Sequence, residues 1–354
     1  MGKDRIQYID VAKFLAMLLV VFSHGFRESA CTAFIFSFHL PLFFFLNGMT
    51  VNLDKYSFGD FLVKKLKGYI VPMLGLGVIA VLFDLLVKTI INQPVSGTLF
   101  LTGLGNVINQ ARYLALWFLP ALFFADLFLY GFNKISRGNP IFMGIECLLL
   151  MGVGILFNQY HNVTLTWNVD TAFFGTTFVY LGYLLRRPEF ERLYSFLMKG
   201  RPLPLILGLG LLVATYFLSM YIYETDQMHL EMYARKYGRY YLTLPCAALG
   251  SAGFVFLCRG ITNFALAVPV QLNLALLPFH QVLCFPIFRH KIAYDWWVSS
   301  YPLPASDPKY FGFVLTMTVF SLALVTVVHF ILKYSPISFV VNQPLAGFYR
   351  KKSR

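Results

Sequence analysis

Residues 5–50 contain two hydrophobic segments, RIQYIDVAKFLAMLLVVFSHGF and FSFHLPLFFFLNGMT, joined by a short polar link. A helix that crosses a membrane needs roughly 20 predominantly apolar residues, and each segment approaches that length. Five polar or ionisable side chains interrupt these apolar runs: Asp10, Lys13, His24, His39 and Asn47. Such groups are costly at the depth of a bilayer and mark functional sites there. We therefore expect this pair of helices to hold the chemistry and the other hydrophobic segments to build a chamber around it.

The composition is that of an integral membrane protein. Of the 354 residues, 58% are hydrophobic and 13% are charged, and the mean hydropathy is +0.66. A soluble domain carries roughly 25% charged residues, so this chain lacks the polar side chains needed to coat a soluble globule. The net charge of +13 comes from Lys and Arg in loops. That distribution indicates membrane topology and attraction to anionic lipid headgroups, and it does not indicate nucleic-acid binding.

The five cysteines form no CxxC pair and no spacing typical of a metal site: Cys31, Cys147, Cys246, Cys258 and Cys284. Four of them fall in or beside predicted spans, so we interpret them as small buried apolar residues. The sequence predicts no metal site, no permanently bound cofactor and no appended soluble domain.

Ten segments are apolar enough to cross the bilayer. They predict an all-α polytopic membrane protein in which residues 1–354 form one transmembrane domain. Their approximate bounds are 9–26, 32–51, 69–90, 113–132, 141–158, 167–185, 204–222, 240–258, 264–288 and 311–333. The ninth contains Pro269, Pro278 and Pro286 and is expected to be kinked or broken.

The distribution of Lys and Arg predicts that both termini lie on the cytoplasmic side. With the N-terminus inside, nineteen Lys and Arg residues fall on the inner side and nine on the outer side, and Lys13 lies within the first span. This bias follows the positive-inside rule, and an even number of spans returns the chain to the side on which it starts. We expect a multi-pass protein of the cytoplasmic (inner) membrane.

One face of the first helix carries a charged pair and an imidazole. Lys13 and His24 are eleven residues apart, so they lie within roughly 20° of one face and about 16 Å apart along the axis. Asp10 precedes Lys13 by three residues and lies on the same stripe. This is the layout of a polar path lined from one side. The alternatives are an interfacial ion pair between Asp10 and Lys13, and a helix-end His24 bonded to a carbonyl.

Histidine titrates near neutral pH and is suited to general base catalysis. His24, near the outer end of its helix, is placed to take the proton of an extracytoplasmic hydroxyl group that attacks a carbonyl carbon. Lys13 is suited to hold a negatively charged donor or to stabilise an oxyanion. Since the sequence has no GxSxG motif, direct transfer is favoured over a serine acyl-enzyme.

In the second segment, the run FHLPLFFFLNG places His39, Pro41, Asn47 and Gly48 close together. Pro41 is expected to loosen the helix after His39, and Gly48 allows another backbone to approach closely. An asparagine at membrane depth is usually a hydrogen-bonding partner between helices. We therefore place a packing role for Asn47 ahead of catalysis, and contact with substrate is the alternative.

These two segments resemble the opening of the acyltransferase-3 family of integral membrane acyltransferases, and more narrowly its fucose 4-O-acetylase-like branch. The family's motif of a basic residue, ten intervening residues and a histidine falls on Lys13 and His24. Its His-x-Pro-x-Phe-Phe-Phe-x-Ser-Gly motif falls on residues 39–48, where Asn47 replaces the usual Ser and Leu40 the commoner Met. The predicted catalytic residues are His24, Lys13, Asp10 and His39.

The resemblance continues through most of the chain. ARYLALWFLPALF is similar to the branch's fourth span, TWNVDTAFFGTTFVYLGYLLRR to its sixth, and KYGRYYLTLPCAALGS and LPFHQVL to later segments. Together with the second span, these segments supply the predicted substrate-binding residues: Asn47, Arg112, Trp117, Asn168, Asp170, Arg239 and His280. The resemblance implies acyl-CoA as the donor, ten membrane helices and O-acylation of an extracytoplasmic glycan.

Four of these residues fall at the outer ends of their spans, at the predicted level of His24: Arg112, Trp117, Asn168 and Asp170. Asp170 is placed to orient the imidazole of His24, as the carboxylate does in a catalytic triad. The alternative for Asn168 and Asp170 is capping of a helix N-terminus. His280 is either a second residue of the chamber or a buried, hydrogen-bonded histidine.

The leading hypothesis is a membrane O-acyltransferase, most simply an O-acetyltransferase that uses acetyl-CoA. It acylates a hydroxyl of a cell-surface or lipid-linked saccharide. Lys64, Lys65 and Lys67 either attract the phosphates of CoA or only set the topology. The alternative is a transporter or flippase for a polysaccharide or lipid-linked sugar, although the sequence lacks the inverted repeats that favour transport. A lipid or amino-acid acyltransferase is a third, weaker option. The sequence does not define the oligomeric state.

The remaining ionisable residues have no assigned function. Asp84 and Lys88 form an i,i+4 pair and are interpreted as structural. Asp126 and Glu146 are isolated carboxylates without an assigned partner. Three histidines in predicted outer loops are expected to be solvated: His161, His229 and His290.

Overall fold

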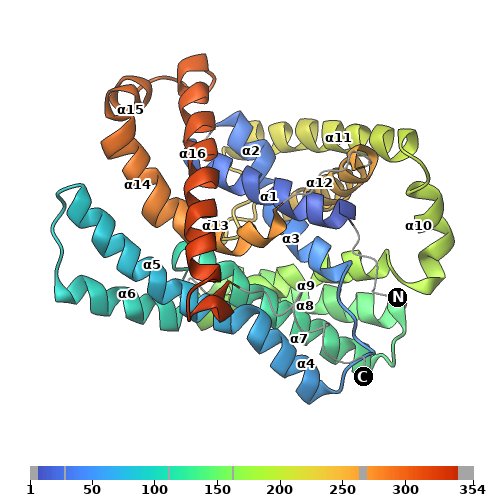
Figure 1. The fold of residues 1–354 in the computed structure, drawn as a ribbon. Helices are drawn as coiled ribbons and strands as arrows, with labels where there is room; N and C mark the ends of the chain where they lie inside the picture. The colour runs from blue at the N-terminus through green and yellow to red at the C-terminus, as the bar shows by residue number, and fades with distance from the viewer. Residues whose placement is uncertain (1–6, 28, 111, 162, 263–268, 342–354) are drawn as a thin grey trace.

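The computed structural model describes residues 7–27, 29–110, 112–161, 163–262 and 269–341 (Figure 1). These ranges are helical and contain no strand, and one isolated bridge joins Glu231 to Lys236. Nine candidate spans within them have the length and hydropathy needed to cross a membrane. The all-α polytopic fold expected from the sequence is therefore confirmed.

The chain is a succession of helices of very different lengths. The α-helices are α1 (Gln7–Gly25), α2 (Ala30–Phe36), α3 (His39–Gly48), α4 (Phe58–Lys65), α5 (Val71–Ile90), α6 (Gly97–Asn109), α7 (Phe118–Ile135), α8 (Pro140–Tyr160), α9 (Val169–Leu184), α10 (Glu191–Leu197), α11 (Pro202–Asp226), α12 (Tyr240–Ile261), α13 (Asn273–Phe279), α14 (Phe285–Ile287), α15 (Tyr294–Ser300) and α16 (Pro308–Lys333). The short 3₁₀ helices are η2 (Leu114–Trp117), η3 (Thr166–Asn168), η4 (Pro188–Phe190), η5 (Val270–Leu272) and η8 (Ser338–Val340). The π-helical turns are η1 (Leu66–Ile70), η6 (His280–Cys284) and η7 (Phe288–Ile292). Because π turns occur frequently at functional sites, the two in the ninth span single out that segment.

Nine of the ten predicted spans correspond to candidate spans of the structure, and the exception is α9. This helix has 16 residues, or about 24 Å of length, which is shorter than the roughly 30 Å hydrocarbon core. Its flanks pack on α3, α7 and α8, and most of its residues are buried. Protein therefore surrounds α9 on most sides. The N-in, C-in orientation stays a prediction.

Two spans are interrupted where proline falls. The second divides into α2 and α3 at Ser37 and Phe38, so the predicted break after His39 is wrong by two residues. Pro41 is the third residue of α3, where a backbone N–H has no partner within the helix, and its ring blocks continuation from four residues earlier. The ninth span is broken into α13, α14 and two π turns, as its prolines predict. Its first predicted residues, 264–268, lie outside the described residues.

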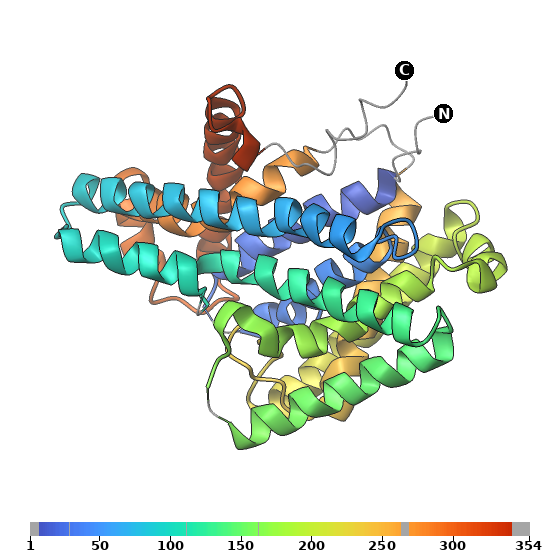
Figure 2. The ribbon, with the colours of Figure 1, turned by 90° about the horizontal axis from the view of Figure 1, so that it is seen from below.

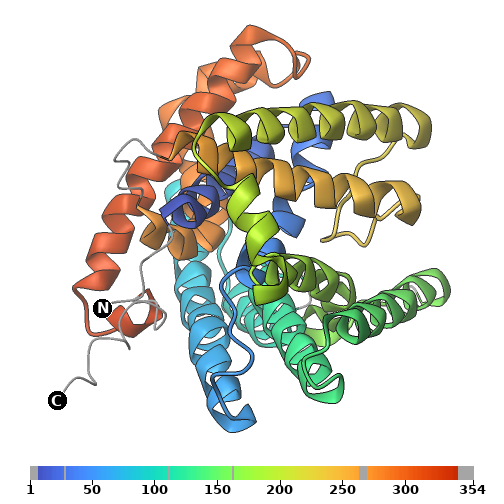
Figure 3. The same cartoon turned by 90° about the vertical axis from the view of Figure 1, so that its right-hand side faces the viewer.

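The spans rich in polar groups lie inside the bundle and the uniformly apolar ones lie outside. α1 packs against α3, α12, α13 and α16, and Figure 1 shows it in the middle of the molecule. By contrast, α8 and α11 bury 17% and 22% of their most apolar windows. Figure 3 shows α11 beside α12, with α8 (green) projecting at the edge. These exposed apolar helices form the surface that we expect to face lipid.

α3 and α9 cross closely because each has a glycine at the crossing. A Cβ atom at Gly48 would lie 1.9 Å from the carbonyl oxygen of Val179, and one at Gly182 would lie 1.9 Å from that of Phe45. Neither position has room for a side chain. The close approach predicted for Gly48 is confirmed, and it fixes α3 against the centre of the bundle.

The sequence did not predict the helical hairpin formed by α5 and α6. α6 has 13 residues and runs alongside α5 (Figure 2). Gly77 of α5 and Gly103 of α6 face valines of the opposite helix and allow the close contact. α5 continues from α4 through η1, so that 58–90 is one helix of 33 residues.

Candidate active site

Two histidines from distant parts of the chain meet at the end of α1. His24 lies in the last turn of α1, and His280 begins the π turn η6. Nδ1 of His24 lies 2.8 Å from Nε2 of His280, and the stacked rings have centroids 5.1 Å apart. Nδ1 of His280 lies 2.5 Å from the carbonyl oxygen of Leu276, one helical turn earlier. His280 is therefore the buried, hydrogen-bonded histidine of the two alternatives drawn from the sequence: it is 0% exposed, and it contacts the predicted base from outside the cavity lining.

These hydrogen bonds define which nitrogen of His24 is basic. A carbonyl oxygen can only accept, so Nδ1 of His280 carries a proton and Nε2 of the neutral ring accepts. Nδ1 of His24 is then the donor to His280, which leaves the lone pair of His24 on Nε2. The amide of Gln281 lies 3.1 Å from the same Nδ1. Its oxygen is the atom able to accept there, since the two ends of an amide are assigned from such networks.

His24 lines a cavity of about 750 Å³, a size typical of sites for small molecules. The walls come from α1, α2, α5, the loop after α11 and the segment 281–290. The charged residues of the lining come from three places: Asp84 and Lys88 on α5, Glu231 and Lys236 in the loop after α11, and Arg289 in η7. The cavity therefore brings an imidazole and a set of fixed charges to one space.

Phe36, at the end of α2, contacts three histidines. Its ring centroid lies 4.8 Å from those of His39 and His229 and 6.3 Å from that of His24. His39 is 1% exposed, and its Nδ1 donates to the carbonyl oxygen of Ile35 at 2.9 Å. His229 is half-buried and lines the cavity, where the loop after α11 contacts Phe36 of α2. His39 packs behind the cavity wall and does not line the cavity itself.

Lys13 and Asp10 lie on the same helix as His24 but away from the cavity. α1 is continuous, so the predicted separation of about 16 Å between Lys13 and His24 is retained. At Lys13 the helix meets the ninth span, where the side-chain amide of Asn273 donates to the carbonyl oxygen of Lys13 at 2.8 Å. Both charged side chains are partly exposed and neither lines the cavity. The stripe on α1 therefore has a cationic end and an imidazole end.

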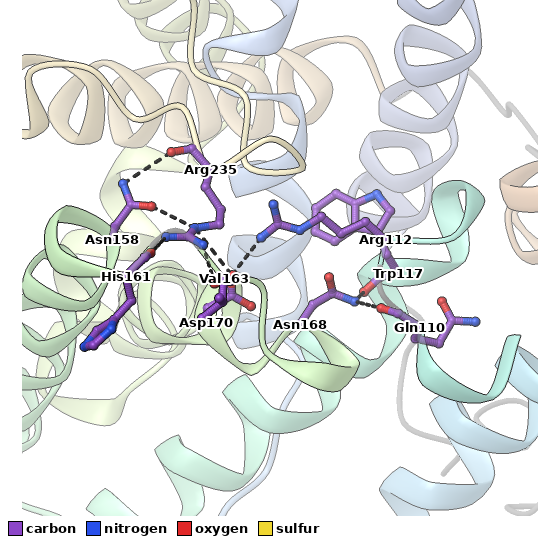
Figure 4. Close-up of polar contacts among 9 residues, drawn as sticks. All are labelled: Gln110, Arg112, Trp117, Asn158, His161, Val163, Asn168, Asp170 and Arg235. Atoms are coloured by element: carbon purple, nitrogen blue, oxygen red, sulfur yellow. Dashed lines mark hydrogen bonds and ion pairs between the residues drawn. The ribbon is translucent and has the colours of Figure 1, made fainter. Parts of the chain in front are cut away.

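A second polar cluster lies where α9 begins (Figure 4). Oδ2 of Asp170 lies 2.7 Å from a terminal nitrogen of Arg112 and 3.8 Å from Nε of Arg235. Nε of Arg235 also donates to Oδ1 of Asn158 at 2.9 Å, and its terminal nitrogens donate to two carbonyl oxygens of the loop before α9. Burial raises the pKa of the adjacent Tyr237 phenol, which stays neutral. The structure brings Arg112 and Asp170 into contact and adds Arg235 to them, while their shared level with His24 stays a prediction.

The backbone around this cluster is strained. Nδ2 of Asn168 donates to the carbonyl oxygens of Gln110 at 2.7 Å and of Trp117 at 3.3 Å (Figure 4). Asn168 occupies the N-cap position of α9 but makes no side-chain capping bond. Six of the nine described non-glycine residues with positive φ gather here: Gln110, Arg112, Leu114, Trp167, Asn168 and Arg235. Such conformations cost of order 1–3 kcal/mol each and persist where the surroundings fix them.

Two predicted contacts differ in the structure. Asp170 does not orient His24, because two guanidinium groups attract the carboxylate more strongly than a neutral imidazole would, and His280 lies beside His24 in its place. Arg239, a predicted substrate-binding residue, pairs with Asp226 at 2.8 Å and does not line the cavity. The middle of the loop after α11 therefore lines the cavity, and Arg239 anchors the end of that loop.

A third polar cluster explains Asn47 and Asp126. Nζ of Lys65 lies 2.5 Å from Oδ2 of Asp126, and their side chains are 7% and 0% exposed. Nδ2 of Asn47 donates to Oδ1 of Asp126 at 2.6 Å. The hydroxyl of Tyr69 lies 3.0 Å from Oδ1 of Asn47 and 3.1 Å from Oδ2 of Asp126. This geometry supports the packing role of Asn47, and it commits Lys65 to Asp126 rather than to the phosphates of a donor.

Sequence reasoning missed several residues of the cavity. Asp84 and Lys88 form the expected ion pair, at 2.6 Å, but they also line the cavity. Gln281 could have been found from its place next to His280. Arg289 could not, because its direction depends on π turns that shift the helical register and leave no signature in the sequence.

A family model described as an acyltransferase domain matches residues 6–330. This range contains the histidine pair, the cavity and both buried charged clusters. No curated protein and no solved structure matches the chain. In the described ranges, no group of three or more His, Cys, Asp or Glu side chains is arranged to hold a metal ion.

Proposed function

This chain belongs to the acyltransferase-3 family, and from that premise we propose that it is a membrane O-acyltransferase. The donor is acyl-CoA from the cytoplasm, with acetyl-CoA as the simplest case. The acceptor is a hydroxyl group of an extracytoplasmic or lipid-linked saccharide. The protein acts in the cytoplasmic membrane with both termini inside, as a member of the fucose 4-O-acetylase-like branch.

The histidine pair is the observation that supports this proposal most directly. His24 has its lone pair on Nε2 because its Nδ1 keeps the proton and donates it in hydrogen bonds to His280 and Gln281, and it lines a cavity large enough for a sugar. The proton of the acceptor hydroxyl passes to Nε2 of His24 as the oxygen attacks the thioester carbonyl carbon. The new C–O bond forms, the C–S bond breaks, and the CoA thiolate leaves and receives the proton. The ester remains on the acceptor.

The second requirement is a route for the donor to reach His24. Lys13 lies on the same face of α1, about 16 Å away, at the end that we place nearer the cytoplasm. It stabilises the negative charge of the donor, because the oxyanion forms beside His24 and lies too far from Lys13. Lys64 and Lys67 attract the CoA phosphates at the same end of the bundle. The roughly 16 Å interval is a length that the extended pantetheine arm of CoA can bridge.

The family also bears on the alternative functions. A transporter or flippase requires a polar path but no base with a defined tautomer, and an acyltransferase domain does not favour it. The acceptor class distinguishes a saccharide acyltransferase from one that acts on lipids or amino acids. Mass spectrometry of surface polysaccharide from cells with and without the gene identifies that class directly.

Purified protein with radiolabelled acetyl-CoA and a glycan extract tests the activity. We expect label on the glycan with wild-type protein and none with His24→Ala. His161→Ala removes an exposed histidine outside the cavity lining and should retain activity. Full transfer by His24→Ala would exclude His24 as the base. A wild-type protein that moves sugar across vesicles without labelling it would support transport instead.

A further inference from the structure

Arg289 is a cation of the cavity wall for which the described residues provide no carboxylate partner. It lies in the π turn η7 and lines the same cavity as His24. The other charged residues of the lining form two ion pairs: Asp84 with Lys88 at 2.6 Å, and Glu231 with Lys236 at 3.2 Å. These pairs cancel, so among the described residues of the lining Arg289 holds the one positive charge that no described carboxylate balances.

Aromatic rings hold the guanidinium group of Arg289 in place. Its Cζ lies 4.5 Å from the ring centroid of Trp297 and 5.3 Å from that of Phe285. Its Nε is buried and has no hydrogen-bond partner within the described part of the chain. A guanidinium fixed in this way presents a planar set of donors that matches a carboxylate or a phosphate. Because its orientation is set in advance, it loses little freedom when an anion binds.

An uncompensated cation in an apolar protein requires an explanation. Arg289 is half-buried and its Nε is fully buried. A charge drawn partly out of water is stabilised by an opposite charge and by hydrogen bonds, and no described side-chain carboxylate pairs with Arg289. Lys88 and Lys236 face the same space but are already neutralised. The missing anion is therefore expected to come from the molecule that enters the cavity.

We infer that the acceptor carries a carboxylate or a phosphate close to the hydroxyl that is acylated, and that Arg289 binds this anionic group. The inference rests on the proposed function, because it names the class of acceptor for the same site. His24 comes from α1 and Arg289 from η7, and both line the one cavity, so a single acceptor can contact His24 through its hydroxyl and Arg289 through its anionic group. Arg289 is in this role a specificity-determining residue.

Binding measured without catalysis tests the inference directly. The full chain, purified in a non-ionic maltoside detergent, is titrated by calorimetry with methyl glucuronide, methyl glucoside and glucose 6-phosphate. Wild-type protein should bind the two anionic probes about tenfold or more tightly than the glucoside, the effect of one charge-assisted contact. Arg289→Gln should bind all three with the weak affinity of the glucoside. Arg289→Lys keeps the charge without the planar donors and should show an intermediate preference.

Lys291→Gln is the matched control. It removes a positive charge two residues away, on an exposed side chain outside the cavity lining, and it should leave the preference unchanged. Equal binding of charged and neutral probes by wild type would overturn the inference. The inference would also be overturned if the wild type bound neither anionic probe, or if Arg289→Gln kept the preference for anionic probes.

A phospholipid headgroup offers the same anionic chemistry from a different source. The titrations are therefore repeated in nanodiscs of phosphatidylcholine with and without phosphatidylglycerol, together with native mass spectrometry of bound lipid. If Arg289→Gln loses bound phosphatidylglycerol but keeps its preference among the sugars, the cation serves lipid and the inference is wrong. Anion-selective binding without any acetyl transfer would retain the anionic site and refute the proposed function. Acetyl transfer with no preference for a charged acceptor would retain the proposed function and refute the anionic site.

Discussion

Replacing His280 by alanine tests whether the imidazole pair sets the basic nitrogen of His24. In the structure, the 2.8 Å contact to His280 keeps the proton on Nδ1 of His24, and the 2.5 Å contact to Leu276 keeps His280 in the accepting tautomer. The variant retains the amide of Gln281, at 3.1 Å, as the nearby acceptor. Leaving a buried donor poorly satisfied costs about 1–3 kcal/mol. We expect kcat to fall by about 5- to 150-fold, with little change in KM for either substrate.

The assay is steady-state transfer from labelled acetyl-CoA by purified protein. His280→Gln retains an oxygen that can accept from Nδ1 and should recover part of the lost kcat. His329→Ala removes another buried histidine, on α16 and outside the cavity lining, and controls for a general loss of packing. The acidic limb of the pH–rate profile should move in His280→Ala but not in His329→Ala. An unchanged kcat in His280→Ala, or a loss equal to that of His329→Ala, would refute the positioning argument.

Three further predictions concern the scaffold. Asp126→Ala leaves Lys65 buried without its partner at 2.5 Å and should lower the free energy of unfolding by about 3–5 kcal/mol, measured by SDS unfolding in mixed micelles. Adding Lys65→Met should restore most of this loss, and additive losses would contradict the pairing. Gly48→Ala places a Cβ atom 1.9 Å from a carbonyl oxygen of α9 and should destabilise by about 1–3 kcal/mol or more. Gly59→Ala, with no neighbouring atom within 4 Å, should not destabilise, and equal effects would argue against the close crossing. Arg235→Ala removes the bonds that anchor the loop after α11, so limited proteolysis in that loop should accelerate and KM for the acceptor should rise; an unchanged digestion pattern would oppose this role.

Most of the fold could be predicted because a bilayer imposes a simple length requirement on each span. Nine of the ten predicted segments are candidate spans of the structure. α6 was not predicted because it is too short to span a bilayer by itself. It packs against α5, and the composition of a short segment does not reveal such a contact. The helix break was predicted after His39, whereas the structure has it before His39, at Ser37 and Phe38. Pro41 predicts that the helix is interrupted, but the position of the break depends on the backbone four residues before the proline.

Only some residues of the candidate site could be predicted from the sequence, and their pairings could not. The polar groups at membrane depth identified His24. For His280, 256 residues away, the sequence left two interpretations: a residue of the chamber, or a buried, hydrogen-bonded histidine. The sequence does not say which carboxylate a given cation meets. Asp170 was therefore predicted to contact His24, whereas in the structure Asp170 forms ion pairs with Arg112 and Arg235. Contacts of this kind depend on the tertiary arrangement of several helices, which spacing along one helix cannot supply.

Charge compensation separates the structural polar groups of this protein from those that can serve a ligand. The carboxylate of Asp126 is matched by a lysine and two neutral donors, so that cluster has nothing left to bind. In the cavity, by contrast, His24 has a free lone pair and Arg289 has no described carboxylate beside it. A negative substituent near the reacting hydroxyl would oppose its loss of a proton, because negative charge grows on the attacking oxygen. Arg289 offsets that repulsion while His24 takes the proton, so the same cation that selects a charged acceptor also lets it react.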